Sequence, residues 1–279
     1  MSDAIETRQA KGGDLVRRHR VSTRLWHWVN AAALLVLLMS GLMIFNAHPR
    51  LYWGEYGANP DHAWLEIGAT RRGEGAVRIG SAMIRTTGVL GVFTDGEGRQ
   101  QARAFPGWAT IPSHYSLADA RLWHLAVAWV LAPGLLAYLL WSLGNGHLRR
   151  DIRIARAEWR PAHVWRALRD HARLRWPRGA DALRYNVLQK MAYAAVLFGL
   201  LPLAIVTGMA MAPGIDAGIV PVTALFGGRQ SARSIHFLCA FGLAGFTLIH
   251  LVMVVMAGPL NELRSMITGW FRLPQEPGA

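Results

Sequence analysis

Residues 24–45 read RLWHWVNAAALLVLLMSGLMIF, and after the initial arginine they contain no Asp, Glu, Lys or Arg. A helix needs about 20 mostly apolar residues to cross the hydrocarbon core of a bilayer. Residues 122–143, 191–211 and 235–258 meet the same requirement. The sequence therefore predicts an all-α membrane protein, a bundle of four transmembrane helices. A soluble protein with large buried helices is the weaker alternative.

The basic residues of the chain indicate how these helices are oriented. The formal net charge is +13, which in another context would suggest a nucleic-acid partner. Here many of the arginines gather in two places, the first 24 residues and residues 144–183. If four helices alternate, both places lie on one side, and positive charge favours the cytoplasmic side. We therefore predict a multi-pass protein of the bacterial inner membrane, with both termini cytoplasmic, membrane lipid around it and no nucleic-acid partner.

This topology divides the chain into three parts. Residues 1–24 form a basic cytoplasmic N-terminus, and a charged stretch of this kind without a small-residue cleavage site favours a retained first span over a signal peptide. Residues 25–258 form the four-helix domain, with an outer loop at residues 46–118 and an inner amphipathic loop at residues 144–183. Residues 259–279 form a cytoplasmic tail.

Both loops carry patterns of their own. In the outer loop, residues 76–79 and 91–94 have the composition of short strands, and the second of them leads into the turn-forming residues 95–98, which predicts a small β-hairpin. We expect this loop to cap the outer face and to receive a partner protein, or else to form a self-packed lid. In the inner loop, residues 148–176 mix arginines with apolar residues, which is typical of an amphipathic helix on anionic lipid.

Histidines are the only strongly ionisable side chains inside the predicted spans, and such residues are functional hypotheses by default. They are His27, His124, His236 and His250. The first three each follow an arginine by three residues, and these arginines are Arg24, Arg121 and Arg233. Residues three apart lie on nearly one face of a helix, so each arginine lies about a turn closer to the water than its histidine.

The topology gives each histidine a depth in the membrane. The helix of His27 begins on the inner side, whereas the helices of His124 and His236 begin on the outer side. His250 lies fourteen residues beyond His236, which is about 21 Å along the helix axis and within roughly 40° of the same direction. The sequence therefore predicts an outer pair, His124 with His236, and an inner pair, His27 with His250.

Two histidine pairs stacked across a membrane are what two six-coordinate b-type haems require, with one imidazole on each axial face of the iron. We expect His124 and His236 to bind the outer haem iron, and His27 and His250 to bind the inner haem iron. Zinc would need a compact tetrahedral cluster, which two layers about 20 Å apart cannot form. A proton relay and ordinary core histidines are the alternatives.

The arginines and the single cysteine bear on the same hypothesis. Arg24 could contact the propionates of the inner haem, and Arg121 and Arg233 those of the outer haem. They could equally mark the helix ends and extend to the interface. Cys239 is the only cysteine, so the chain has no attachment motif for c-type haem and no iron–sulfur cluster of its own.

These features resemble the di-haem cytochrome b subunits of membrane-bound NiFe hydrogenases, formate dehydrogenase-N and thiosulfate reductases. The resemblance rests on the basic N-terminus that leads into residues 24–28 (RLWHW), on His124 in the second span, on a third span without a ligand, and on the spacing of His236 and His250. It covers the four spans, about half of the chain. It implies a four-helix cytochrome b in which the four histidines are the axial ligands. The outer loop is longer than a minimal member of this family would need.

The predicted function is transmembrane electron transfer that connects an extracytoplasmic redox protein to the membrane quinone pool. The partner would be a hydrogenase, a molybdenum enzyme or a c-type cytochrome. The chain would act as the electron-transfer subunit, with quinone reduction or quinol oxidation as an activity of its own. Quinone would bind near the inner face, among His19, Arg20, Arg24, Asn30 and the inner ends of the first and fourth spans.

Two other classes of function stay open. The first is a self-sufficient membrane haem oxidoreductase, of the superoxide oxidase or ferric reductase type, although the long outer loop argues against it. The second is a haem-free transporter or anchor in which the histidines form a proton path. The sequence contains no phosphate-binding glycine loop, paired catalytic carboxylates or nucleophile triad, so it predicts no catalytic side chain.

Overall fold

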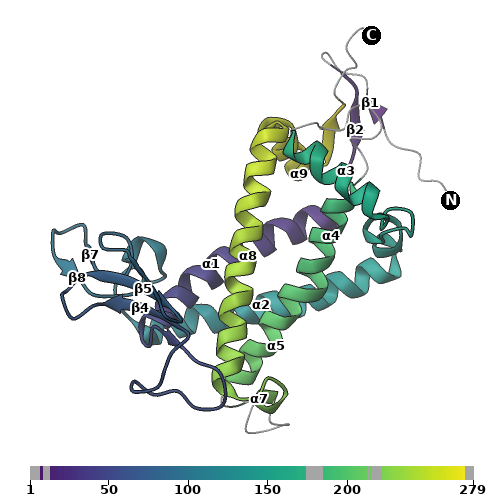
Figure 1. The fold of residues 1–279 in the computed structure, drawn as a ribbon. Coiled ribbons are helices and arrows are strands. Elements are labelled where there is room, and N and C mark those ends of the chain that lie inside the picture. The colour runs from purple at the N-terminus through teal and green to yellow at the C-terminus, as the bar shows by residue number, and fades with distance from the viewer. Residues whose placement is uncertain (1–6, 9–12, 174–184, 213, 215–221, 274–279) are drawn as a thin grey trace. The chain divides into compact units, whose positions relative to one another are not determined.

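The computed structural model describes residues 7–8, 13–173, 185–212, 214 and 222–273. Residues 174–183 of the predicted inner loop and residues 274–279 of the predicted tail lie outside the described residues. The helices, labelled in Figure 1, are α1 Val21–Asn46, α2 Leu117–Gly144, α3 Pro161–Ala172, α4 Val187–Ala195, α5 Leu201–Met211, α7 Val222–Leu225, α8 Arg229–Ala257 and α9 Pro259–Thr268. The strands are β1 Thr7–Arg8, β2 Leu15–Arg17, β3 Arg50–Leu51, β4 Leu65–Ala69, β5 Gly75–Ile79, β6 Ala82–Arg85, β7 Phe93–Thr94, β8 Gln100–Gln101 and β9 Trp270–Arg272.

Four helical segments of the described chain are long and apolar enough to cross a membrane, which confirms the four predicted spans. They are Val21–Asn46, Leu117–Gly144, Val187–Met211 and Arg229–Ala257. Large apolar side chains on their surfaces, such as Trp129 and Leu248, are exposed, as expected for helices whose outer surface is solvated by lipid.

The third span is not a uniform α-helix. Between α4 and α5 the residues Val196–Leu200 form a π-helical turn, directly before Pro202. Proline lacks a backbone N–H, and in an α-helix its ring clashes with the carbonyl four residues earlier. The π-helical turn changes the helix geometry directly before this proline. Helix α2, in contrast, continues through Pro133.

The described chain consists of two compact units. The first contains Met1–Asn30, Gly134–Gly199 and Leu243–Ala279, and the second contains Ala31–Pro133 and Leu200–Gly242. The boundaries between the units fall within the four spans, so each span contributes residues to both units.

In the second unit, residues 46–118 form a small β-rich domain. Its sheets are a four-stranded antiparallel sheet, with strand order β3-β4-β5-β6, and the two-stranded hairpin β7-β8. The predicted hairpin around residues 95–98 is confirmed as β7-β8. The other predicted strand, residues 76–79, lies within β5 of the larger sheet. The β-content of this loop is therefore higher than the single hairpin that the sequence predicts.

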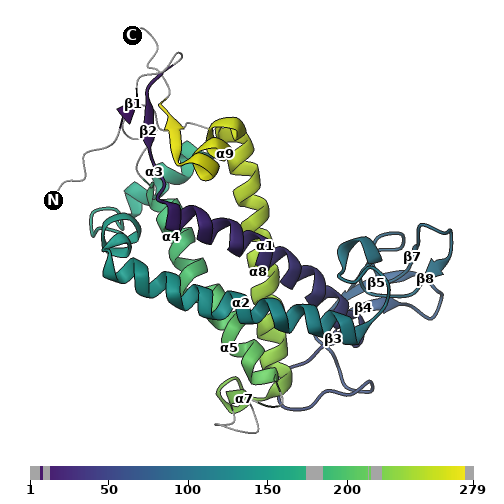
Figure 2. The ribbon, with the colours of Figure 1, turned by 180° about the vertical axis from the view of Figure 1, so that it is seen from behind.

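The 46–118 loop is fastened to the ends of α1 and α8. The Asn46 side chain donates to the Phe105 carbonyl and accepts from the Phe105 N–H, at 3.0 and 2.7 Å. Ser234 on α8 donates to the Tyr52 carbonyl and accepts from the Trp64 indole N–H. Figure 2 shows the strands of this loop next to the ends of α1 and α2 that belong to the same unit. These hydrogen bonds fix the position of the loop relative to the first turns of α8.

In the first unit, the two ends of the chain form a sheet. Strand β2 pairs with β1 and with β9, so a segment near the N-terminus is joined to a segment near the C-terminus. Helix α9 packs against β9, and the two lie close together in Figure 1. The sequence predicts only a basic N-terminal segment at residues 1–24 and a tail at residues 259–279, so these strands and α9 are not predicted.

The predicted amphipathic helix at residues 148–176 is wrong as one continuous element. A π-helical turn, Leu148–Ile152, is followed by irregular residues, and α3 begins only at Pro161. The backbone of Arg160 is extended, with ψ of 129°, because a residue before proline is disfavoured in the α-helical region. Helix α3 itself exposes Trp165 and Leu168.

Candidate functional site

His124 on α2 and His236 on α8 face each other in the second unit. Their ring centres are 6.1 Å apart, and the ring planes are inclined by 63°. The structure thus brings together the two histidines that the predicted topology assigns to one layer. Ligation of iron by them stays a prediction.

The His124 ring is held by a turn of α1. The Ser40 hydroxyl oxygen lies 3.0 Å from Nδ1 of His124. Ser40 is fully buried and donates its own proton to the Val36 carbonyl at 2.6 Å. Because a hydroxyl has one proton, its oxygen is left to accept from the histidine ring.

The His236 ring is held in the same way by a turn of α5. The Thr207 hydroxyl oxygen lies 3.1 Å from Nδ1 of His236, and the Ala204 carbonyl lies 2.9 Å from the same nitrogen. Thr207 is fully buried and donates to the Leu203 carbonyl at 2.6 Å. A carbonyl can only accept, so Nδ1 of His236 carries the proton, and the lone pair of a neutral ring is then on Nε2.

Glycines make this close approach of helix and ring feasible. A Cβ atom at Gly41 would lie 3.4 Å from Cε1 of His124, and one at Gly208 would lie 3.3 Å from Cε1 of His236. Both glycines directly follow the hydroxyl residue that contacts the same ring. Each ring therefore lies against the backbone of the neighbouring helix.

His27 on α1 and His250 on α8 form a second pair, in the first unit. Their ring centres are also 6.1 Å apart, with ring planes inclined by 61°. The Phe246 ring stacks on His250 at an interplanar angle of 12°. In the part of the chain that the structure describes, Nδ1 of His27 is buried and has no hydrogen-bond partner, and the same holds for Oδ1 of Asn30.

Two imidazoles at this separation can hold one metal ion between them. A bond from a first-row metal to an imidazole nitrogen is about 2 Å long, and the ring centre lies about 1 Å behind that nitrogen, so two such bonds in line separate the ring centres by about 6 Å. Both pairs have a separation of 6.1 Å. The donor set and the ring spacing therefore fit a cofactor with two axial imidazole ligands.

The three arginines of the Arg-x-x-His pattern have different surroundings. Arg24 donates to the Ile267 carbonyl at 2.6 Å, while its Nε is buried and has no partner among the described residues. Arg233 donates to the His48 carbonyl. Arg121 is exposed on α2. Propionate contacts of these arginines stay predictions.

His19 and Arg20, two of the residues predicted to bind quinone, precede α1 in the first unit. Arg20 is exposed, whereas His19 is partly buried. Burial lowers the pKa of His19 to about 4, and the neighbouring positive charges of Arg18 and Arg24 act in the same direction. His19 is therefore neutral at physiological pH, so it can take part in hydrogen bonding without adding to the positive charge of Arg18 and Arg24.

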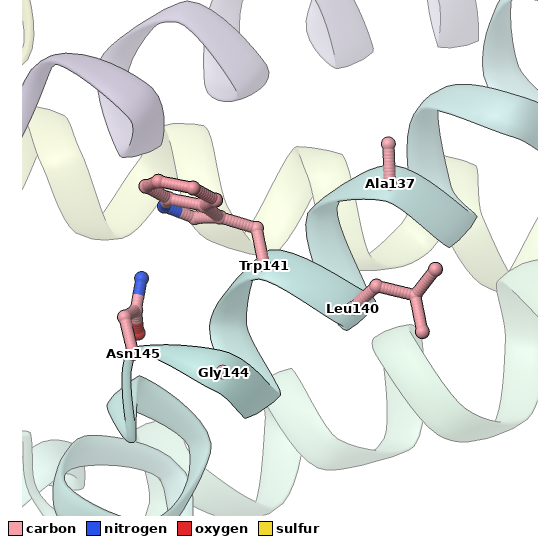
Figure 3. Close-up of a pocket in the computed structure, with 5 residues that line it drawn as sticks. All are labelled: Ala137, Leu140, Trp141, Gly144 and Asn145. Atoms are coloured by element: carbon pink, nitrogen blue, oxygen red, sulfur yellow. The ribbon is translucent and has the colours of Figure 1, made fainter.

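A pocket of about 520 Å³ lies at the C-terminal end of α2, also in the first unit. Figure 3 shows the Trp141 and Leu140 side chains projecting from α2 in different directions, with Asn145 just beyond the helix. The lining is almost entirely apolar and consists of Ala137, Leu140, Trp141, Gly144 and Asn145. Such a pocket suits an apolar group, such as a lipid or quinone tail.

Ser40 and Thr207 are site residues that the sequence does not predict. Hydroxyl residues are common in membrane helices, where they often bond their own backbone. The sequence signal that could have identified them is that each directly precedes a glycine in the last third of a span, in a chain whose spans carry histidines. A search for hydroxyl–glycine pairs would have pointed to both.

Comparison with known proteins gives a consistent result. Residues 18–269 match the protein family described as prokaryotic cytochrome b561. The chain is also similar to the putative protein-methionine-sulfoxide reductase subunit YedZ1 of Azospira oryzae, with 28% identity over 153 residues, which are 55% of this chain and 72% of that protein. No solved structure matches the chain.

Proposed function

The chain belongs to the prokaryotic cytochrome b561 family, and from this premise we propose that it transfers electrons across the bacterial inner membrane through two b-type haems. Membership of this family implies that b-type haem is the cofactor. The proposal adds the number of haems, their ligands and the two ends of the electron path. These ends are an extracytoplasmic redox protein and the membrane quinone pool.

The observation that carries the proposal is the presence of two histidine pairs with the same ring separation, 6.1 Å. His124 and His236 would hold one haem iron, and His27 and His250 the other. In the first of these pairs the hydrogen bonds at Nδ1 leave Nε2 as the nitrogen for the metal. When bound, each haem would supply a one-electron carrier whose iron has no open coordination position.

The quinone would bind in the first unit, near His27. Nδ1 of His27, Oδ1 of Asn30 and Nε of Arg24 are buried atoms without a partner among the described residues. Buried polar atoms are nearly always hydrogen-bonded in native proteins, so a group of three unpaired ones calls for an explanation. A quinone carbonyl accepts hydrogen bonds and would suit the nitrogens of His27 and Arg24, whereas a quinol hydroxyl would suit the Asn30 oxygen.

The extracytoplasmic partner would be the catalytic subunit of an oxidoreductase. The relative from Azospira oryzae is described as a subunit of a putative protein-methionine-sulfoxide reductase. This likeness favours a reductase of that kind over a hydrogenase or a c-type cytochrome as the partner. Copurification of such a subunit with the tagged chain would support the assignment. If the purified chain, without any partner protein, reacts with a small substrate such as superoxide or ferric iron, a self-sufficient oxidoreductase is favoured instead.

The test of the two-haem proposal is the haem content of single and double variants. The purified protein should show a reduced-minus-oxidised spectrum with a b-type α band and about two haems per chain. His124→Ala and His236→Ala should each remove the same haem, so the double variant should lose no more than either single variant. His124→Ala combined with His27→Ala should remove both haems, because one ligand of each pair is lost.

A matched control uses a histidine outside the spans. His62 is exposed in the 46–118 loop, and His62→Ala should keep the full haem content. A spectrum without a b-type band would end the haem proposal and favour a transporter or anchor. Additive haem loss on combining His124→Ala with His236→Ala would contradict the pairing while leaving haem binding itself intact.

A further inference from the structure

We propose that Ser40 and Thr207 are positioning residues that fix the two axial ligands of the His124–His236 haem and lower its reduction potential. The inference rests on the proposed function, because it assumes that a haem binds between these histidines. The positioning groups are two hydroxyl–glycine pairs, Ser40-Gly41 and Thr207-Gly208. We call these two pairs the two clamps.

The two clamps are built alike on different helices. Each hydroxyl donates to the backbone carbonyl four residues earlier, at 2.6 Å in both cases. Each hydroxyl oxygen then lies 3.0 or 3.1 Å from Nδ1 of a histidine on the next span along the chain. The glycine that follows each hydroxyl lies against the Cε1 atom of the same ring. In the Thr207 clamp the Ala204 carbonyl, three residues before the hydroxyl, also lies 2.9 Å from Nδ1 of His236. Helices α1 and α5 therefore hold His124 and His236 by the same hydroxyl–glycine arrangement.

This arrangement determines which ring nitrogen faces the cofactor. In His236 the Ala204 carbonyl can only accept, so Nδ1 carries the proton. In His124 the Ser40 hydroxyl has its proton on the Val36 carbonyl, so Nδ1 of the ring is again the donor. Nε2 is then left as the metal ligand in both rings. The hydroxyl oxygen accepts from the same N–H, since its own proton is already committed to the helix backbone. The Nδ1–H of His236 is thereby shared between two acceptors, and the Nδ1–H of His124 is bonded to the Ser40 oxygen. Neither ring can rotate without losing these bonds.

Hydrogen bonding at Nδ1 changes the chemistry of the ligand as well as its position. An acceptor at Nδ1–H makes the imidazole more basic and a better electron donor at Nε2. A stronger donor stabilises ferric iron more than ferrous iron, so the reduction potential falls. Loss of either hydroxyl should therefore raise the potential of this haem.

The rise in reduction potential on loss of a clamp hydroxyl should be specific to the His124–His236 haem. Ser40 and Thr207 are buried in the second unit, together with His124 and His236. In the other pair, Nδ1 of His27 has no partner among the described residues. The two haems therefore differ in how their ligands are supported, and a change in one clamp should appear in only one of two redox transitions.

The experiment is an optical redox titration of the haem-loaded full-length protein, with the variants Ser40→Ala and Thr207→Val. Each variant should raise the reduced-to-oxidised ratio of one haem about threefold at a fixed potential, because an acceptor at Nδ1–H of one ligand is lost. The double variant should raise this ratio about tenfold, which corresponds to a rise of 59 mV in the reduction potential of a one-electron couple. The second haem should keep its potential in every variant.

Conservative variants and a matched control separate this role from a structural one. Ser40→Thr and Thr207→Ser keep the hydroxyl and should retain the wild-type potential, because each residue type already fits one of the two clamps. Thr247 on α8 donates to the Leu243 carbonyl at 2.8 Å, as the clamp hydroxyls donate to theirs, and it belongs to the first unit, whereas His124 and His236 belong to the second. Thr247→Val should leave the potential of that haem unchanged.

The possible outcomes are distinguishable. Unchanged potentials in Ser40→Ala, Thr207→Val and the double variant, with both haems bound, would overturn the inference while the two-haem function stands. A shift of both haems by the same amount, or an equal shift in Thr247→Val, would also overturn it. A wild-type protein without two redox transitions would mean that the proposed function itself has failed.

Discussion

At the scale of the residue, His19 lies in surroundings that disfavour its charged form. Burial and the nearby guanidinium groups of Arg18 and Arg24 lower its pKa from 6.5 to about 4. The unfolded chain would therefore bind more protons than the folded chain between these two pH values. Folding stability contributed by the neutral ring is fully present above about pH 6.5 and is lost as the pH falls toward 4.

This linkage predicts how the variant His19→Gln should behave. The wild-type protein should lose thermal stability on acidification from pH 6.5 to pH 4, by at most about 1.4 kcal/mol per pH unit from this one group. Glutamine cannot take up a proton, so the variant should show a shallower loss over the same range. The exposed His62 provides the control, and His62→Gln should follow the wild-type curve. Parallel melting curves for wild type and His19→Gln would contradict the assignment.

Residues of the site differ in how well the sequence predicts them. His27, His124, His236 and His250 are predictable because an ionisable side chain in an apolar span is rare and costly. Their grouping into pairs follows from helix rise and alternating topology. Ser40 and Thr207 are not predictable by this reasoning, because a hydroxyl in a span is satisfied by its own backbone and needs no second partner.

At the scale of the element, α9 is held against the start of α1 by side-chain hydrogen bonds. The last carbonyls of a helix lack partners within the helix. Here Trp28 donates its indole N–H to the Met266 carbonyl at 3.2 Å, and Arg24 donates to the Ile267 carbonyl at 2.6 Å. Gly269, with φ of 91°, ends α9 in the left-handed region. The Arg18 N–H then bonds the Gly269 carbonyl.

These contacts predict the effect of Trp28→Phe. The variant keeps an aromatic ring but removes one donor, so a helix-end carbonyl loses its partner and the free energy of unfolding should fall by about 1 kcal/mol. Scanning fluorimetry should show a lower melting temperature, and limited proteolysis should cleave the C-terminal segment faster. Trp159 is exposed, and Trp159→Phe should leave both measurements as in the wild type. If Trp28→Phe and Trp159→Phe have the same melting temperature and the same cleavage rate, the indole hydrogen bond of Trp28 does not contribute to stability.

Elements of the fold are predictable where the signal is local. The spans follow from hydropathy alone, and the β7-β8 hairpin follows from its turn residues. Strands β1, β2 and β9 are two or three residues long, and β2 pairs with β9 across almost the whole chain. No local sequence pattern predicts them. Residues 148–176 have the composition of one amphipathic helix, but Pro161 prevents α-helical geometry at Arg160.

At the scale of the whole molecule, the charge distribution predicts one orientation in the membrane. Four spans return the chain to the side on which it started, so the N-terminal segment, residues 144–183 and the C-terminal segment lie together. The cytoplasmic side is favoured for them because arginines there are abundant. The 46–118 loop would then lie outside. This orientation decides which histidine pair is closer to the extracytoplasmic partner and which to the quinone site proposed near His27.

Single-cysteine labelling can test this orientation with little background. The native Cys239 is buried, at 3% exposure, so a membrane-impermeant maleimide should hardly react with it. Glu97 lies in the β7-β8 hairpin and is 70% exposed, and Arg156 is exposed in the loop between α2 and α3. Glu97→Cys should be labelled in intact spheroplasts, whereas Arg156→Cys should be labelled only after the membrane is opened or inverted. The opposite pattern would place the 46–118 loop in the cytoplasm, and the redox partner and the quinone would then exchange sides.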